Sequence, residues 1–415
     1  MSRAPRLRLR MHTRLRTGHS IDLLEGSRAF FPALVAAMDA AQHVVRLETY
    51  IFDCTGAGAE VAEALVRAAQ RGVQTCVVVD GLGTGALPQA WRERFAVAGV
   101  QWRVYSQVSM LALLLPTRWR RLHRKLCVVD SGWDGAVGFC GGINILDDFH
   151  DPNFGALDAP RFDFAVRITG PIVGHIDTTM QVLWRRLQAV RDLRQHKLQE
   201  AVETFLTAKS RSLPAPETIA GDAPSTSAAL VLRDNLRSRT RIERAYLRAI
   251  GAAQHEIIIA NAYFVPGFRL RQALVAAAER GVRVQLLLQG RYEYFMQYYA
   301  ARPVYGVLLG AGVEIHEYAP SFLHAKVAVV DGHWATVGSS NLDPLSLLLA
   351  REANVVVDDT AFAATLRKRL LQAMQEGGQA MNPATYARRP LRQRGLEYLA
   401  MLVMRLALLV TGKRY

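Results

Sequence analysis

The stretch HRKLCVVD at residues 123–130 returns as HAKVAVVD at residues 324–331, and this repetition is the main clue to the architecture. Working outward, AAQHVVRLETYIF (40–52) resembles AAQHEIIIANAYF (252–264), and LVRAAQRGVQTCVVVDG (65–81) resembles LVAAAERGVRVQLLLQG (274–290). On the other side of the motif, GGIN (141–144) matches GSSN (338–341). Because the matches keep one order, the sequence predicts two copies of a unit of about 190 residues.

Within each copy, helical and strand-like segments alternate. The pattern predicts helices over 34–41, 61–71 and 90–98, and strands over 44–52, 73–79, 101–105, 125–129 and 136–140. Apolar strands between helices indicate sheets that are covered on both faces. We therefore expect an α/β fold of two tandem repeats, each a mixed β-sheet flanked by helices, with the active site at their pseudo-two-fold interface.

Composition along the chain suggests five regions. Residues 1–20 form a basic N-terminal segment, 21–209 the first repeat, and 228–380 the second. Residues 210–227, with three prolines and clustered Ser and Thr, read as a linker. The final region, 381–415, is basic and apolar, and a helix over 396–410 would be too short to span a bilayer but could lie on a membrane surface.

Each copy carries the same polar constellation. In a strand, alternate residues share a face, so His123 and Lys125 point together while Asp130 points away. The same holds for His324 and Lys326 against Asp331, so both aspartates are expected to hold a turn. The Gly-rich turns should let the backbone approach a ligand closely, with Asn144, Asn341 and Ser339 hydrogen-bonding a phosphate.

Two copies that face each other would place two histidines, two lysines and two asparagines around one point. Such a set suits a phosphodiester, because cations and amide donors neutralise the non-bridging oxygens. One imidazole can attack phosphorus while the other protonates the leaving oxygen. Asp163 and Glu352, which begin strand-like runs after the turns, are candidates for orienting the histidines.

These motifs resemble the phospholipase D (PLD) superfamily, whose mark is the paired HxKxxxxD motif with GG or GS and Asn. LETYIF (47–52), ANAYFVP (260–266) and GSSNLDPLSLLLAREANVVV (338–357) look most like the shorter bacterial cardiolipin synthases. The resemblance implies a phosphatidyltransferase that joins two phosphatidylglycerols and releases glycerol, without metal or cofactor. It implies a catalytic set in which His123 is the nucleophile and His324 the acid and base, with the other motif residues Lys125, Asp130, Lys326 and Asp331.

The chain departs from the family pattern in two places. Four extra residues lie within 131–140, which predicts a longer hairpin turn, and Ala350 stands where the family has Asn. The first copy also carries 12 extra residues between Tyr105 and His123, including the apolar run 108–115, which could line a lipid entrance.

The net charge of the chain indicates which class of partner it binds. With 51 Lys and Arg against 36 Asp and Glu, the net charge of +15 predicts a polyanionic partner. The same constellation serves nucleases, but apolar segments flanked by arginine favour an anionic membrane surface and phospholipid substrates over nucleic acid. The motifs are also compatible with a hydrolytic phospholipase or a non-catalytic lipid-binding scaffold. The expected location is the cytoplasmic face of the inner membrane, as a peripheral protein.

Two further groups could suggest metal binding. The four cysteines lack zinc-ligand spacing. The DDFHD cluster at 147–151 has no counterpart in the second copy and is interpreted as a solvated loop.

Overall fold

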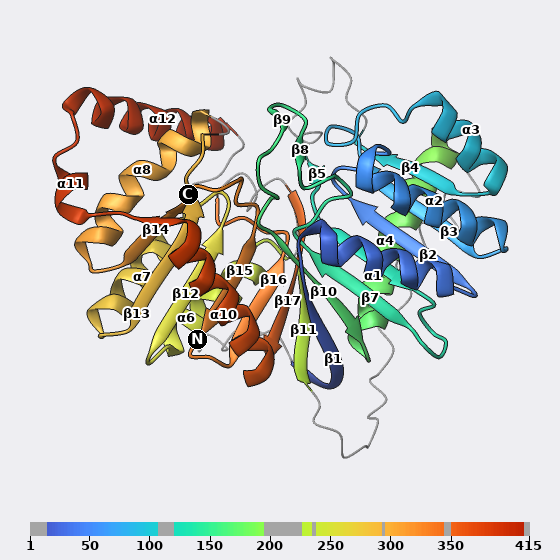
Figure 1. The fold of residues 1–415 in the computed structure, drawn as a ribbon, viewed down its shortest axis with the longest axis horizontal. Helices are drawn as coiled ribbons and strands as arrows, with labels where there is room; N and C mark the ends of the chain where they lie inside the picture. Colours follow the sequence, from blue (N-terminus) through green and yellow to red (C-terminus); the bar gives the residue numbers. More distant parts are fainter. Residues whose placement is uncertain are drawn as a thin grey trace, which may run out of the picture.

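The computed structural model describes residues 15–106, 120–194, 226–234, 238–292, 295–343 and 350–410. A single 16-stranded sheet runs through the molecule, with helices on both faces (Figure 1). Its order is β18-β14-β13-β12-β15-β16-β17-β11-β1-β10-β7-β6-β2-β3-β4, with β5 paired to β17. From the centre outward, the order β1-β10-β7-β6-β2-β3-β4 in one half matches the order β11-β17-β16-β15-β12-β13-β14 in the other. The repeat in the sequence is therefore also a repeat in the sheet.

The first half contains β1 (Arg16–Glu25), α1 (Gly26–Ala40), β2 (Val44–Thr49), α2 (Gly56–Gln70), β3 (Gln74–Asp80), α3 (Gln89–Ala98), β4 (Gln101–Tyr105), β5 (Arg121–Leu122), β6 (Lys125–Val129), β7 (Val137–Gly141), β8 (His150–Asp151), β9 (Gly155–Ala156), β10 (Phe164–Thr169) and α4 (Ile172–Arg194). The small strands β8 and β9 form a separate hairpin. All the helices and strands predicted for this half are confirmed, with ends shifted by a few residues. The helix predicted over 34–41 begins earlier, at Gly26.

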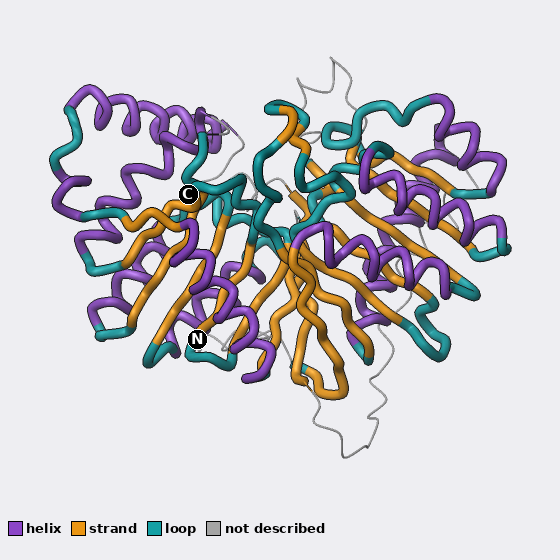
Figure 2. Tube along the Cα trace, in the orientation of Figure 1, coloured by secondary structure: helices purple, strands orange, loops and turns teal. Residues whose placement is uncertain are grey.

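The second half contains β11 (Thr226–Arg233), α6 (Arg241–Ala252), β12 (Glu256–Asn261), α7 (Phe268–Glu279), β13 (Arg283–Gln289), α8 (Phe295–Gly310), β14 (Glu314–Tyr318), β15 (Lys326–Val330), β16 (Trp334–Gly338), β17 (Ala350–Asp358), α10 (Thr360–Gly377), β18 (Gly378–Ala380), α11 (Pro383–Ala387) and α12 (Leu391–Val410). In Figure 2 the strands of the two halves fan out from the centre without a break.

Strands β1 and β11 join the two halves edge to edge. They pair antiparallel, so the two expected sheets are one continuous sheet. Strand β1 begins at Arg16, inside the predicted basic segment, and β11 begins at Thr226, inside the predicted linker. The apolar run 108–115 and linker residues 210–225 lie outside the described residues.

One hydrophobic core is shared by both halves. It gathers strand residues such as Val128 and Val166 with Val329 and Val355, and both α4 and α10 pack against it through Ile176 and Leu366, among others. Two further cores lie on the other face of the sheet, one in each half. Because apolar burial is the main stabilising contribution to folding, the shared core fixes how the two copies meet.

The extension between Asp130 and Gly141 lengthens the β6–β7 turn, as predicted. Gly132 and Gly135 adopt φ values of 94° and 79° in this turn. Beyond it, β7 stays in register with β6, with Lys125 opposite Gly141. The extra residues are therefore accommodated at the end of the hairpin that lies away from His123.

A buried ion pair distinguishes the first copy from the second. The Arg124 guanidinium donates to both oxygens of Glu48, and the two residues are only 4% and 1% exposed. The matching positions of the second copy are Ala325 and Ala260. Strand alternation turns Arg124 away from His123 and towards α4, where it reaches the carbonyl oxygen of Thr179. The ion pair is thus a structural feature of one half.

Arg124→Ala is expected to destabilise the protein by about 3–5 kcal/mol, because it leaves the Glu48 carboxylate buried without a partner. The double variant Glu48→Ala/Arg124→Ala, which copies the second half, should be more stable than Arg124→Ala. Thermal unfolding of the three proteins measures this. A double variant that melts no higher than Arg124→Ala would contradict the explanation.

Candidate active site

Both motif histidines line one cavity between the two halves. The cavity has a volume of about 550 Å³, and its walls include His123, His324, Asn144, Asn341 and Asp163. His123 lies just before β6 and His324 just before β15, so the corresponding ends of two related strands meet. The structure therefore brings together residues about two hundred positions apart, at the predicted interface.

Each histidine is hydrogen-bonded by an acid from the opposite half. The Nδ1 atom of His123 lies 3.1 Å from the carboxylate of Glu352, and Nδ1 of His324 lies 2.6 Å from that of Asp163. An acceptor at Nδ1 holds the proton there and leaves the Nε2 lone pair available. Neither half alone supplies both members of either of these two pairs.

Strand pairing across the interface explains this exchange. Strand β17 extends beyond its own sheet partners to pair in parallel with β5, and the N–H of His123 donates to the carbonyl of Arg351 at 3.0 Å. On the other side, the N–H of His324 donates to the carbonyl of Phe162 at 2.9 Å. In each case the acid is the residue that follows the accepting carbonyl. The backbone thus fixes the position of each carboxylate beside the partner histidine.

The two lysines are buried beside the histidines. Lys125 is 4% exposed and Lys326 is not exposed at all. Each ammonium group donates to the carbonyl oxygen of the histidine two residues earlier, at 2.8 Å for Lys125. Burial and the nearby Lys326 lower the pKa of Lys125 to about 7. Glu352, Asp163 and Asp80 lie close enough to act on the Lys125 charge, and the two ammonium groups beside the histidines can still bind the anionic oxygens of a ligand.

Burial and charge also shift the histidines and their acids. Burial lowers the pKa of His123, and burial together with both lysines lowers that of His324 well below its ordinary value. Burial raises the pKa of Asp163 to about 6. Burial acts on Glu352 in the same direction, but His123, Lys125 and the Ser339 hydroxyl outweigh it and lower the pKa of Glu352. The two acids are therefore not equivalent.

Ser339 creates part of this asymmetry. It was expected to bind phosphate, but its hydroxyl is fully buried and donates to Glu352 at 2.5 Å. Its counterpart in the first copy is Gly142, where an added Cβ atom would clash with the carboxylate of Asp163. The Gly-rich turn therefore admits the orienting acid rather than the ligand. Ser339 is a positioning residue for Glu352.

The two aspartates of the motifs lie away from the cavity. Asp130 accepts hydrogen bonds from the backbone N–H groups of Gln42, His43 and Val44, each at 2.8 Å. Asp331 binds Gln254, His255 and Glu256 in the same way. Each aspartate sits at the far end of its strand and fixes the loop that leads into the neighbouring strand. Both aspartates thus hold turns, as strand alternation indicated, and neither is among the residues that line the cavity.

The asparagines lie where they were predicted. Asn144 lines the cavity while its Oδ1 accepts from the N–H of Ile51 at 3.1 Å, which turns its amide nitrogen towards other partners. Asn341 is 2% exposed, and its Oδ1 has no hydrogen-bond partner among the described residues. Asn144 can therefore donate an amide hydrogen bond to a ligand in the cavity, whereas the unpartnered atom of Asn341 is an acceptor that suits a hydroxyl group.

Two tyrosines that were not singled out also line the cavity. The ring of Tyr50 lies 5.0 Å from that of His123, and the Lys125 ammonium lies 5.5 Å from the Tyr50 ring centre. Tyr263 lines the opposite wall. Both occur in stretches of sequence that carried the family resemblance, LETYIF and ANAYFVP. They do not align with each other in the repeat, so the symmetry argument overlooked them.

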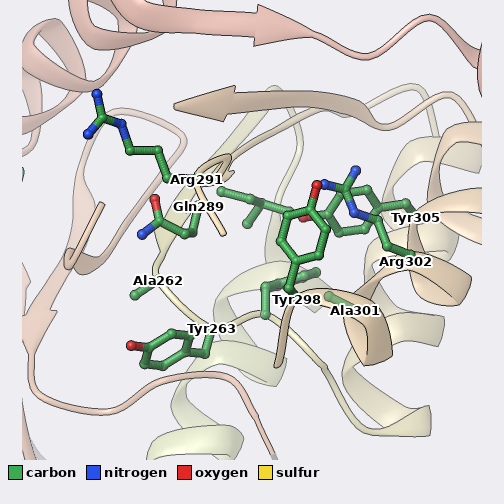
Figure 3. A pocket seen from close by; sticks show the side chains of 10 residues that line it. Ala262, Tyr263, Gln289, Arg291, Tyr298, Ala301, Arg302 and Tyr305 are labelled. Carbon is green, nitrogen blue, oxygen red and sulfur yellow. The ribbon is translucent and has the colours of Figure 1, made fainter. Parts of the chain in front are cut away.

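Tyr263 also borders a smaller crevice in the second half (Figure 3). There the Arg302 guanidinium lies 4.5 Å from the ring centre of Tyr298 and is 2.7 Å from the carboxylate of Glu317. The crevice has a volume of about 20 Å³, which is room for little more than water. Its second arginine, Arg291, donates to the carbonyl oxygens of Ala319 and Pro320, so both cations are engaged and the larger cavity between the halves is the stronger candidate for chemistry.

Comparisons with known proteins agree with this geometry. A family model described as "Cardiolipin synthase, PLD-like domain" matches residues 34–155 and 246–374. The chain is 39% identical over 356 residues to cardiolipin synthase B of Escherichia coli (strain K12), covering 86% of this chain and 80% of that protein. It is 30% identical over 386 residues to a cardiolipin synthase of Geobacillus sp. (strain WCH70), covering 92% and 71%.

A solved structure extends the likeness to the fold. The phosphatidylserine synthase of Haemophilus influenzae Rd KW20 superposes with a TM-score of 0.68 at 12% identity, covering 96% of each chain. Within the described residues, no helix combines the length and apolarity needed to cross a bilayer. With one family match in each copy and 39% identity to a relative over most of its length, the chain belongs to the PLD-like cardiolipin synthase family.

Proposed function

We propose that this chain is a cardiolipin synthase that transfers a phosphatidyl group between two phosphatidylglycerol molecules and releases glycerol. The observation that carries the proposal is the single cavity with two histidines, each oriented by an acid of the opposite half. Membership of the PLD-like cardiolipin synthase family supports phospholipid substrates.

In the first step, Nε2 of His123 attacks the phosphorus of one phosphatidylglycerol. A nitrogen–phosphorus bond forms and the bond from phosphorus to the headgroup glycerol oxygen breaks. His324 gives its Nε2 proton to that oxygen, and glycerol leaves. Lys125 and Lys326 stabilise the charge on the non-bridging oxygens.

In the second step, a headgroup hydroxyl of another phosphatidylglycerol attacks the phosphatidyl-histidine. His324, now neutral, takes the hydroxyl proton as the oxygen–phosphorus bond forms. The bond between phosphorus and His123 breaks, and cardiolipin is released with both histidines returned to their starting states. If water took the place of the lipid hydroxyl, the product would be phosphatidic acid.

The opposite pKa shifts of Glu352 and Asp163 support His123 as the nucleophile. A carboxylate that stays ionised stabilises the positive charge that develops on an attacking imidazole. Glu352, with a lowered pKa and the Ser339 hydroxyl bound to it, fits this role. Asp163, with a pKa raised to about 6, is better suited to a histidine that gains and loses protons. A bound phosphodiester anion would oppose the effect of the lysines and raise the pKa of His324 towards neutrality.

Product analysis tests the proposed function. Purified protein mixed with phosphatidylglycerol vesicles should yield cardiolipin and glycerol in equal amounts. Phosphatidic acid as the sole phospholipid product would show that the protein is a hydrolase and not a synthase. Cleavage of DNA without lipid turnover would favour a nuclease of the same superfamily.

The C-terminal helix α12 supports a peripheral position on an anionic membrane surface. One side of α12 packs on α8, with Ala400 and Met404 buried. The other side leaves large apolar residues between 36% and 56% exposed: Leu396, Tyr398, Leu399, Leu402, Val403 and Leu406. A helix with an exposed apolar face on a chain of net charge +15 fits the headgroup region of an anionic bilayer.

Leu399→Gln/Leu402→Gln is expected to lower sedimentation with phosphatidylglycerol vesicles about tenfold, because both side chains would leave the bilayer. Turnover of detergent-dispersed lipid should stay the same. Val97→Gln, at an 89% exposed position on α3, is the matched control. Equal vesicle binding by the double variant and the control would rule out α12 as the contact.

A further inference from the structure

The first copy carries a hairpin beside the active-site cavity, in a segment that is longer than its counterpart in the second copy. From Asn144 to Asp163 is 19 residues, whereas from Asn341 to Glu352 is 11. The added length contains strands β8 and β9, and Pro152 and Asn153 between them line the cavity. In Figure 1 this hairpin and α12 both lie along the upper edge of the sheet. The longer segment of the first copy therefore adds a hairpin that borders the cavity.

The DDFHD cluster, interpreted from sequence as a solvated loop, is the rigid frame of this hairpin. Asp148 and Asp151 are each only 5% exposed. Asp151 accepts from the N–H groups of Asn153 and Phe154 at 2.8 and 3.2 Å. Arg161 donates to Asp151 and to the carbonyl of His150, both at 2.7 Å. The solvated-loop interpretation is thus wrong for the two buried acids, and the side chains beside them are held on a fixed backbone.

Three large apolar side chains project from this rim. Leu82, Phe149 and Phe154, here called the apolar lip, are 54%, 52% and 47% exposed. Phe154 packs on Phe322 with ring centres 5.2 Å apart, and Leu82 lines the cavity itself. Phe149 directly precedes β8, and Phe154 lies in the turn between β8 and β9. Exposed apolar side chains that gather beside a cavity mark a site where an apolar partner can bind.

We propose that the apolar lip inserts into the surface of an anionic phospholipid bilayer and seats the mouth of the cavity against it. This inference rests on the proposed function. The lip would let a phospholipid move its headgroup into the cavity while its acyl chains stay in the apolar phase, which avoids exposing them to water. The net charge of +15 attracts an anionic bilayer and repels a second copy of this chain, so charge complementarity selects the bilayer as the occupant.

Comparing bilayer and dissolved substrates tests the lip. Phe149→Ser/Phe154→Ser should lower both sedimentation with phosphatidylglycerol vesicles and turnover of those vesicles by about tenfold or more. Turnover of short-chain phosphatidylglycerol, dissolved as monomers, should stay within about twofold. Phe149→Leu/Phe154→Leu keeps the apolar character and should restore vesicle binding. Trp133→Ser is the matched control, because Trp133 is 50% exposed in the β6–β7 turn at the opposite edge of the sheet.

The outcomes separate the lip from the proposed function. Unchanged vesicle binding in the serine variant would overturn the lip, and so would an equal loss of turnover on dissolved and vesicle lipid. A wild-type dimer that becomes a monomer in the serine variant would assign the lip to a second copy instead. If the wild type makes no cardiolipin from either substrate, the proposed function fails, while the sedimentation comparison still decides whether the lip binds the bilayer.

Discussion

His123→Ala is expected to lower the turnover of phosphatidylglycerol at least about 10³-fold, as loss of a covalent nucleophile does in other enzymes. The variant has no nitrogen to bond to phosphorus, and the buried Glu352 loses its histidine partner. His324→Ala should lose a similar factor, because the departing glycerol oxygen receives no proton. His333→Ala is the matched control, since His333 is hydrogen-bonded to Asp358 on the surface.

A substrate with a better leaving group separates the two histidines. A nitrophenyl ester of phosphatidic acid releases nitrophenolate, which needs no protonation. His324→Ala should therefore still show a burst of nitrophenolate, while His123→Ala should show none. A burst in His123→Ala that is absent in His324→Ala would exchange the two roles.

Glu352→Gln is expected to lower kcat about 10³-fold or more with little change in KM, because an amide cannot stabilise positive charge on His123. The amide can also donate to Nδ1, which would favour the tautomer with its proton on Nε2 and remove the attacking lone pair. Steady-state kinetics on dissolved short-chain phosphatidylglycerol measures the effect, and thermal unfolding checks that the variant folds. A loss of less than about tenfold would contradict the assigned role.

Ser339→Ala tests the role of Glu352 with a milder change than Glu352→Gln. It removes the hydroxyl that donates to Glu352 but keeps the carboxylate. The loss in kcat should be smaller than for Glu352→Gln, because the ionised acid remains beside His123. A larger loss than in Glu352→Gln would mean that Ser339 contacts the substrate, as the sequence had suggested.

Much of the fold could be predicted because the sequence contains two copies of the same unit. The repeat located the motif strands, and the apolar pattern placed β4 and β6 at their observed bounds. The joining strands were missed for a physical reason. β1 is mostly exposed or half-buried, so Arg16–Glu25 shows no apolar run, and its first residues belong to the arginine-rich stretch 1–20 that suggested a basic segment. Its partner β11 begins at Thr226, inside the Ser- and Pro-rich stretch that suggested a linker.

The sequence predicted the residues of the candidate site but not which acid bonds to which histidine. The histidines, lysines and both acids follow from local patterns. Which acid serves which histidine depends on β5 pairing with β17 and on Phe162 pairing with Leu323, contacts between residues far apart in the chain. The buried side chain of Ser339 likewise follows from packing against Glu352. Local spacing carries no information on either point.

Trapping the covalent intermediate tests the central claim most directly. The protein is mixed with phosphatidylglycerol, quenched in alkali within one turnover, digested and examined by mass spectrometry. The account predicts a phosphatidyl group on the peptide that contains His123 and none in His123→Ala. Modification of His324 instead, or rapid cardiolipin formation with neither histidine modified, would contradict it.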